Sequence, residues 1–190
     1  EVFCRRPMRT WTGHKNDVLE LAWSKNNFLL SSSMDKTVKL WHVTRDECLY
    51  TFKHSDFVTS VAFHPKDERL FLSGSMDGKL RLWSIPEKRV KYWQEIPNNE
   101  VCTAVGFTAD GRMCAVGSYS GNCVFYRVSS GLKYHTQILV KSRGKGGRAK
   151  KITGIQAMPG LAPGEDKASG MLITSNDSRI RLYNLRDMSL

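Results

Sequence analysis

The sequence predicts an all-β protein, a β-propeller made of four-stranded blades. The segment SSSMDKTVKLW begins at residue 31 and returns as SGSMDGKLRLW at residue 73, a period of 42 residues. A repeat of roughly 40–45 residues is typical of propeller blades. Each repeat contains short apolar runs separated by turn residues, and 41% hydrophobic with 25% charged residues is an ordinary globular composition.

The first two repeats, residues 12–53 and 54–95, follow one plan. The first opens on Gly13-His14 and the second on His54. Their second and third strands are joined by Met34-Asp35-Lys36 and Met76-Asp77-Gly78, which favour tight turns. The strands are predicted at 18–23, 28–33, 37–43 and 48–52, and then at 58–63, 70–75, 79–85 and 90–93.

The third repeat (96–139) and the fourth (140–190) depart from this plan. In the third, Ser120 replaces the turn Asp, Tyr126 replaces the Trp, and Gly-His is missing. The fourth keeps Asp177 and Tyr183, but Asp177 follows Ser120 by 57 residues, whereas Ser120 follows Asp77 by only 43. About 14 residues are therefore inserted, and segments 141–151 and 159–170 are the candidate loops.

These motifs resemble the WD-repeat family over essentially the whole chain. In that family a His, a Ser or Thr, the turn Asp and the third-strand Trp form a structural hydrogen-bonded tetrad. Alternate residues share a strand face, so the sequence does not choose between the two serines available in each repeat. The resemblance implies one tetrad of His14, Ser31 or Ser33, Asp35 and Trp41, and a second of His54, Ser73 or Ser75, Asp77 and Trp83.

An enzyme is the alternative interpretation of the same residues. His14, Asp35 and a serine are the residue types of a hydrolase triad, but their recurrence in consecutive repeats favours a structural network. We expect no catalytic residues, no metal and no cofactor. The five cysteines form no C-x-x-C pair and are expected to be reduced, packed thiols: Cys4, Cys48, Cys102, Cys114 and Cys123.

The number of blades raises the question of closure. The resemblance implies rings that most often have seven blades, whereas this chain holds about four, and an open arc leaves two blade faces uncovered. Residues 1–11 are expected to form the outer strand of a preceding blade. We therefore expect a segment of a larger ring. A ring closed by two chains, a homodimer through the exposed blade faces, is the alternative.

The residue before each turn Asp is a candidate partner contact. In WD-repeat proteins this position tends to face the entrance of the central channel, and Met and Tyr suit an adaptable protein-binding surface. Packing between blades is the alternative role. The four residues are Met34, Met76, Tyr119 and Asn176.

Basic charge is concentrated in one segment. Of the net charge of +11, residues 141–151 supply +6. Such a segment is able to bind anionic lipid headgroups or a nucleic-acid backbone. Its lack of aromatic residues makes nucleic acid the less favoured partner, and a solvated loop without a ligand is the further alternative. The candidate anion-binding residues are Lys141, Arg143, Lys145, Arg148, Lys150 and Lys151.

A narrower resemblance is carried by FLLSSSMDKTVKLWHV, LKYHTQILV, KKITGI and LITSNDSRIRLYNLRDMSL. These stretches are similar to the rabphilin-type, Rab-binding WD-repeat effectors of recycling endosomes. The resemblance implies a cytoplasmic, noncatalytic scaffold in vesicle trafficking, peripheral on endosomal or Golgi membranes. In that group a Rab GTPase binds sequence before the propeller, hence outside this segment. The start at Glu1, without an initiator Met or an apolar signal core, also suggests part of a longer chain.

Overall fold

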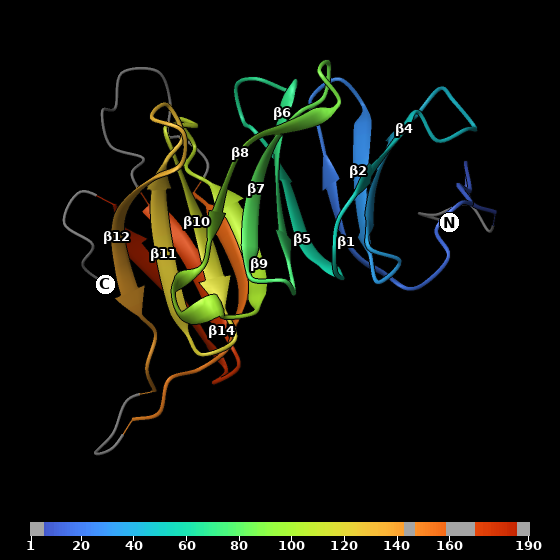
Figure 1. The fold of residues 1–190 in the computed structure, drawn as a ribbon. Coiled ribbons are helices and arrows are strands. Elements are labelled where there is room, and N and C mark those ends of the chain that lie inside the picture. The colour runs from blue at the N-terminus through green and yellow to red at the C-terminus, as the bar shows by residue number, and fades with distance from the viewer. Residues whose placement is uncertain (1–5, 143–146, 159–169, 186–190) are drawn as a thin grey trace.

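A computed structural model describes residues 6–142, 147–158 and 170–185. Of the features expected above, Cys4, Arg143, Lys145 and nearly all of the second candidate loop lie outside these residues. The described chain forms four antiparallel sheets, as the repeat pattern predicts, and Figure 1 shows them side by side in chain order.

Each sheet has its strands in sequence order. The first blade contains β1 (Val18–Trp23), β2 (Phe28–Ser33), β3 (Thr37–His42) and β4 (Tyr50–Lys53). The second contains β5 (Val58–Phe63), β6 (Leu70–Ser75), β7 (Lys79–Ser84) and β8 (Arg89–Glu95). A short 3₁₀ turn, η1 (Pro97–Asn99), leads to β9 (Cys102–Phe107), β10 (Met113–Ser118), β11 (Asn122–Arg127) and β12 (Lys133–Leu139). The fourth blade contains β13 (Ile152–Ala157), β14 (Gly170–Ser175) and β15 (Arg179–Asn184).

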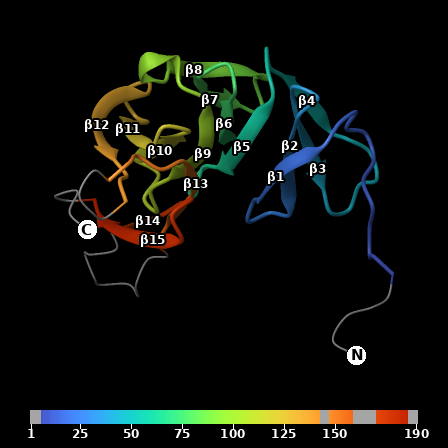
Figure 2. The ribbon, with the colours of Figure 1, turned by 90° about the horizontal axis from the view of Figure 1, so that it is seen from below.

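The four blades form an open arc. In Figure 2 the strands β1, β5, β9 and β13 lie along its inner side, and β4, β8 and β12 lie along its outer side. The connections between second and third strands all leave the same end of the blades. We call this end the turn face, defined by residues 34–36, 76–78, 119–121 and 176–178.

The leading segment differs from expectation, since no strand forms between Arg6 and Asp17. Instead, the Trp11 indole donates to the Arg45 carbonyl at 2.9 Å and packs against Trp41 with ring centroids 6.3 Å apart. No preceding sheet is present among the described residues to pair with this segment. Trp11 therefore packs on the first blade.

Hydrophobic cores lie between the blades. Leu30, Val38 and Leu40 of the first blade pack with Val61 and Phe71 of the second. Equivalent clusters join the second blade to the third and the third to the fourth. The second and third blades therefore bury one face against the preceding blade and the other against the following blade, and blade packing provides the core.

The two end faces expose residues that are buried elsewhere. Leu21 of β1 pairs with Ser31 as Val61 of β5 pairs with Ser73, but Leu21 is 57% exposed and Val61 only 4%. At the other end of the arc, Ile180 is 72% exposed, whereas the equivalent Leu80 of β7 is fully buried. Among the described residues, each end of the arc is thus an apolar blade face without a covering sheet.

Close blade packing makes one glycine essential. A Cβ at Gly74 would lie 2.1 Å from the Cys102 Sγ atom and 2.8 Å from Val105 Cγ1. We expect Gly74→Ala to lower the free energy of unfolding by about 1–3 kcal/mol, because overpacking forces the third blade to shift. Chemical denaturation measures the change.

Ser32 provides the matched control, because it occupies the same position in the first blade and already carries a Cβ. Its buried hydroxyl has no hydrogen-bond partner among the described residues. We expect Ser32→Ala to change stability by less than about 0.5 kcal/mol or to increase it slightly. Equal losses for Gly74→Ala and Ser32→Ala would contradict this account of blade packing.

Candidate functional site

The first blade brings its four expected residues into one hydrogen-bonded chain. The Trp41 indole donates to Ser31 Oγ at 2.8 Å, and Ser31 Oγ lies 2.6 Å from His14 Nε2. His14 Nδ1 lies 2.8 Å from Asp35 Oδ2. Ser33 takes a different role, since its hydroxyl donates to the Asn16 carbonyl and accepts from the Asp35 backbone N–H. The geometry therefore selects Ser31 as the tetrad serine.

Asp35 is held as a carboxylate. Burial opposes its ionisation, but the Thr37 hydroxyl, the Lys15 backbone N–H and His14 all donate to it and lower its pKa to about 2. The Thr37 hydroxyl makes the shortest of these hydrogen bonds, to Asp35 Oδ1 at 2.6 Å. The tetrad ties the turn to strands β2 and β3 and leaves Ser31 engaged by two partners. It fixes blade geometry and presents no free nucleophile.

The second blade does not form the tetrad expected of it. Trp83 donates to Ser73 Oγ at 2.8 Å, and Ser73 Oγ lies 2.8 Å from His54 Nε2, as in the first blade. Asp77, however, makes no hydrogen bond to His54. Arg81 donates through Nη2 to Asp77 Oδ2 at 2.5 Å and through Nη1 to Ser75 Oγ at 2.7 Å.

This arrangement corrects the assignment of Asp77. Ser55 and Ser75 also donate to its carboxylate. Burial works against the charge, but these bonds and the Arg81 guanidinium hold the pKa of Asp77 well below its usual range. The second blade therefore has two separate networks, one of His54, Ser73 and Trp83, and one of Asp77, Arg81, Ser55 and Ser75.

His54 is accordingly held neutral. Burial, followed by repulsion from Arg81, lowers its pKa from 6.5 to about 4. The donors are consistent with a neutral ring: Ser73 donates to Nε2, and Nδ1 lies 3.3 Å from the Phe52 carbonyl.

A pH dependence of stability follows from the depressed pKa of His54. Between pH 6.5 and pH 4 the unfolded chain binds a proton at His54 that the folded chain does not, so stability is expected to fall by about 3 kcal/mol as the pH is lowered. Urea unfolding across this range, compared with a His54→Gln variant, measures the contribution. If both proteins lost the same stability over this range, a neutral buried His54 would be ruled out.

The third and fourth blades use further residues that sequence reasoning did not identify. In the third, Glu100 supplies the carboxylate near Ser120, accepting from the Ser120 hydroxyl and from Asn122 Nδ2. In the fourth, Arg181 donates to Asp177 Oδ2 at 2.6 Å and to Ser175 Oγ at 2.6 Å. Arg81 and Arg181 both stand two residues before the Trp or Tyr of the third strand, in LRLW and IRLY, and that shared position was the available signal.

Three of the described cysteines are fully buried thiols. Burial raises the pKa of the Cys102 thiol to about 12 and those of Cys114 and Cys123 still further. A buried thiol of raised pKa is a poor nucleophile. Among residues 6–142, 147–158 and 170–185, no group of three or more His, Cys, Asp or Glu side chains is arranged to hold a metal ion.

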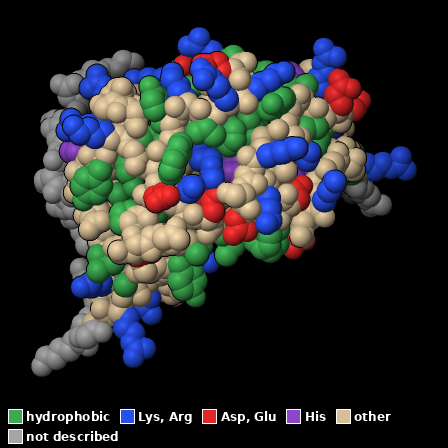
Figure 3. Space-filling view, viewed as in Figure 1, with side chains coloured by type: hydrophobic (Ala, Val, Ile, Leu, Met, Phe, Trp, Pro, Cys, Tyr) green, Lys and Arg blue, Asp and Glu red, His purple; other side chains and the backbone are tan. Residues whose placement is uncertain are grey.

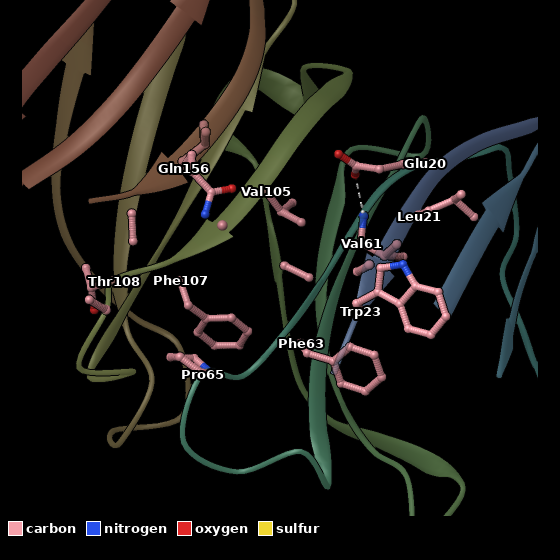
Figure 4. A pocket seen from close by; sticks show the side chains of 16 residues that line it. Glu20, Leu21, Trp23, Val61, Phe63, Pro65, Val105, Phe107, Thr108 and Gln156 are labelled. Atoms are coloured by element: carbon pink, nitrogen blue, oxygen red, sulfur yellow. Dashed lines mark hydrogen bonds between the residues drawn. The ribbon is translucent and has the colours of Figure 1, made fainter. Parts of the chain in front are cut away.

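The inner strands surround a recess of about 340 Å³ (Figure 4). Trp23, Phe63 and Phe107 line it, each from a different blade. Glu20 also contributes, and its carboxylate accepts the Val61 backbone N–H at 2.8 Å. Burial raises the pKa of Glu20, against the opposing hydrogen bonds from Ser60 and Val61. None of the tetrad residues lines this recess.

The turn face carries the four candidate partner contacts. Tyr119 is 66% exposed, Met76 is 40% exposed and Asn176 is also exposed, while Met34 is half-buried. Three of these four side chains are therefore accessible at one end of the arc.

The basic segment forms a hairpin at the same end. Lys141 and Ala149 pair as an antiparallel bridge, and the Ser142 N–H donates to the Arg148 carbonyl at 3.2 Å. Figure 1 shows the arms of this hairpin leaving β12 and extending past the lower ends of the sheets, and Figure 3 shows basic side chains at the lower left, around its base. Four of the six predicted basic residues belong to the described arms: Lys141, Arg148, Lys150 and Lys151.

Comparison with known proteins identifies the repeat type. The family described as "WD domain, G-beta repeat" matches residues 5–42 and 46–84. The chain is 56% identical over 190 residues to WD repeat-containing protein 44 of Xenopus laevis. It is 38% identical over 184 residues to an uncharacterised WD repeat-containing protein of Schizosaccharomyces pombe, and 32% identical over 203 residues to 2-deoxy-glucose resistant protein 2 of Saccharomyces cerevisiae.

The matches extend over nearly all of this chain but over a minor part of each relative. They cover 99%, 96% and 98% of the chain, whereas the chain spans only 20%, 31% and 23% of the three relatives. None of the three names denotes an enzyme. Among the described residues, no helix has the length and apolar character that a membrane crossing requires.

Proposed function

We propose that this chain, whose residues 5–42 and 46–84 match the WD-repeat family, is a noncatalytic scaffold that binds partner proteins at its turn face. Propellers of this family are typically noncatalytic scaffolds that bind proteins. The observation that carries the choice of surface is the exposure of Met76, Tyr119 and Asn176 at one end of three successive blades. The polar side chains around Asp35 and Asp77 are instead hydrogen-bonded to one another, so they stabilise the platform.

The chemistry of the exposed positions supports protein binding. Met is flexible and polarizable, and Tyr combines an apolar ring with a polar tip, which suits both to partner surfaces. Each side chain stands on a turn held by an internal network, Ser75 and Arg81 around Asp77 in the second blade and Glu100 around Ser120 in the third. Rigid turns present these side chains with little ordering cost on binding.

Affinity capture from cell extract with quantitative mass spectrometry tests this function. The bait pair is the wild-type chain and a Met76→Ser/Tyr119→Ser variant. A matched control, Trp93→Ser/Tyr134→Ser, changes two exposed aromatic residues on the outer strands β8 and β12. We expect the first variant to lose specific proteins that the control retains. Equal recovery by all three baits would overturn the assignment of the turn face.

We further propose that the parent protein serves vesicle trafficking in the cytoplasm, peripheral on endosomal or Golgi membranes. A small Rab GTPase would bind sequence outside residues 1–190. The support is the resemblance carried by LKYHTQI and TSNDSRIRLY, which generic WD repeats do not require. Titration of Rab proteins loaded with a GTP analogue tests this proposal. The full-length protein is expected to bind one of them and this chain alone none, and tight binding to this chain would contradict the proposal.

A further inference from the structure

The junction between the third and fourth blades joins three segments on the turn face. The Val140 N–H donates to the Gly121 carbonyl at 2.9 Å, which sets the hairpin against the turn at 119–121. The Asn176 N–H donates to the Lys151 carbonyl at 3.0 Å, which sets the other arm against the fourth-blade turn. Gly121 has a φ of +91°, and a Cβ there would lie 2.8 Å from the Lys150 carbonyl oxygen. The turn and the hairpin are thus packed backbone against backbone.

Within the part of the chain that the structure describes, the cations at this junction have no acidic partner. Among the described residues, no carboxylate lies within ion-pair distance of Lys141, Arg148, Lys150 or Lys151. Several other cations near the turn face are paired: Lys36 with Asp56, Lys79 with Glu95, and Arg179 and Arg181 with Asp177. Uncompensated positive charge held in one place attracts an anionic ligand.

An exposed aromatic ring lies beside these cations. Lys151 Nζ is 5.8 Å from the centroid of Tyr119, whose side chain is 66% exposed. Asn176 adds an exposed side-chain amide from the next turn. The junction therefore brings positive charge, an apolar ring face and a neutral hydrogen-bonding group together from three segments of the chain.

We propose that this junction binds an acidic peptide segment that carries an apolar residue among its carboxylates. Lys141, Arg148, Lys150 and Lys151 receive the carboxylates, and the ring of Tyr119 receives the apolar side chain. The inference rests on the proposed function, since it specifies the chemistry of one partner of the turn face.

A peptide fits better than the other anionic ligands. A lipid surface would meet the arms of the hairpin first, because they extend past the lower ends of the sheets (Figure 1). Tyr119 belongs instead to the turn at residues 119–121, which bonds to the hairpin at Val140. Single-stranded nucleic acid is held by aromatic residues in series, whereas one exposed aromatic residue is present in this group. An acidic segment with one apolar residue uses both the cations and the ring.

Fluorescence anisotropy with a labelled peptide of alternating Glu and Leu tests the proposal. The site variant is Lys150→Glu/Lys151→Glu. The matched control, Lys25→Glu/Lys133→Glu, makes the same charge change at exposed positions on the opposite end of the blades. We expect the site variant to bind about tenfold more weakly and the control to stay within about twofold of wild type. Tyr119→Ala is expected to weaken binding several-fold, and Tyr119→Phe to preserve it, without altering the fold at so exposed a position.

Several outcomes would overturn the proposal. They are no peptide binding by the wild type, equal losses in the site and control variants, or selective binding of phosphatidylserine vesicles or a single-stranded oligonucleotide in place of the peptide. The proposed function is judged separately by affinity capture. If the Met76→Ser/Tyr119→Ser bait captures fewer proteins than wild type but the acidic peptide does not bind the wild-type chain, only this inference fails. If that bait captures the same proteins as wild type, the proposed function fails.

Discussion

Asp77→Ala is expected to lower the free energy of unfolding by about 3 kcal/mol. The change leaves the Arg81 guanidinium, whose side chain is 12% exposed, without the carboxylate that accepts from its Nη2 atom. A largely buried charge without its partner is strongly destabilising. It also strands the Ser55 and Ser75 hydroxyls that donate to Asp77. Urea denaturation followed by circular dichroism measures the loss.

Two comparison variants test whether the loss of stability comes from the buried Asp77–Arg81 pair. Asp67→Ala removes an exposed ion pair with Arg69 and is expected to cost less than about 0.5 kcal/mol. Asp77→Ala/Arg81→Leu removes both members of the buried pair and is expected to recover part of the loss. A double variant less stable than Asp77→Ala alone would show that Arg81 stabilises the blade by other contacts.

Leu82→Ala is expected to cost about 2–5 kcal/mol, while Leu182→Ala costs less than about 0.5 kcal/mol. The two leucines hold equivalent positions, one in β7 and one in β15, but Leu82 is 1% exposed against the third blade and Leu182 is 47% exposed. The two positions therefore differ in whether a neighbouring blade buries the leucine, and this difference sets the expected loss of stability. Chemical denaturation of both variants measures the difference.

An equal cost at the two positions would contradict the open arc. Leu182 would then have to be covered in solution by another sheet, from a second copy or from elsewhere in the parent chain. Repeating the measurement at several protein concentrations separates these cases, because only stabilisation by a second copy depends on concentration.

The repeat pattern predicted most strands because turn residues and apolar alternation are local signals. Four strands have the expected bounds, for example β1 and β6, whereas β4 begins at Tyr50 and not at residue 48. Residues 6–11 form no strand, because a strand needs a neighbouring strand and none pairs with them among the described residues. Their assignment to a preceding blade stays a prediction. Pairing across blades is a tertiary property that a local pattern does not contain.

The candidate site was predictable in kind but not in every contact. The tetrad of the first blade contains the residues that the sequence pattern singled out. The choice of Ser31 over Ser33 follows from their hydrogen bonds, since Ser31 contacts His14 and Ser33 contacts the Asn16 carbonyl. The assignment of Asp77 to the second tetrad failed because Arg81, which lies in β7 four residues after Asp77, binds the same carboxylate. In the first blade the equivalent Lys39 instead donates to Thr51, which leaves Asp35 to His14. The side chain four residues after the turn Asp therefore decides which partner that carboxylate binds.

Site-specific photo-crosslinking tests the central claim, that partners bind the turn face, most directly. A benzophenone amino acid is placed at Met76 on that face or at Lys66, an exposed residue at the opposite end of the same blade. Irradiation in cells is followed by detection of crosslinked proteins on a denaturing gel. We predict discrete crosslinked species from position 76 and none from position 66. Crosslinks from position 66 alone, or equal patterns from both positions, would contradict the claim.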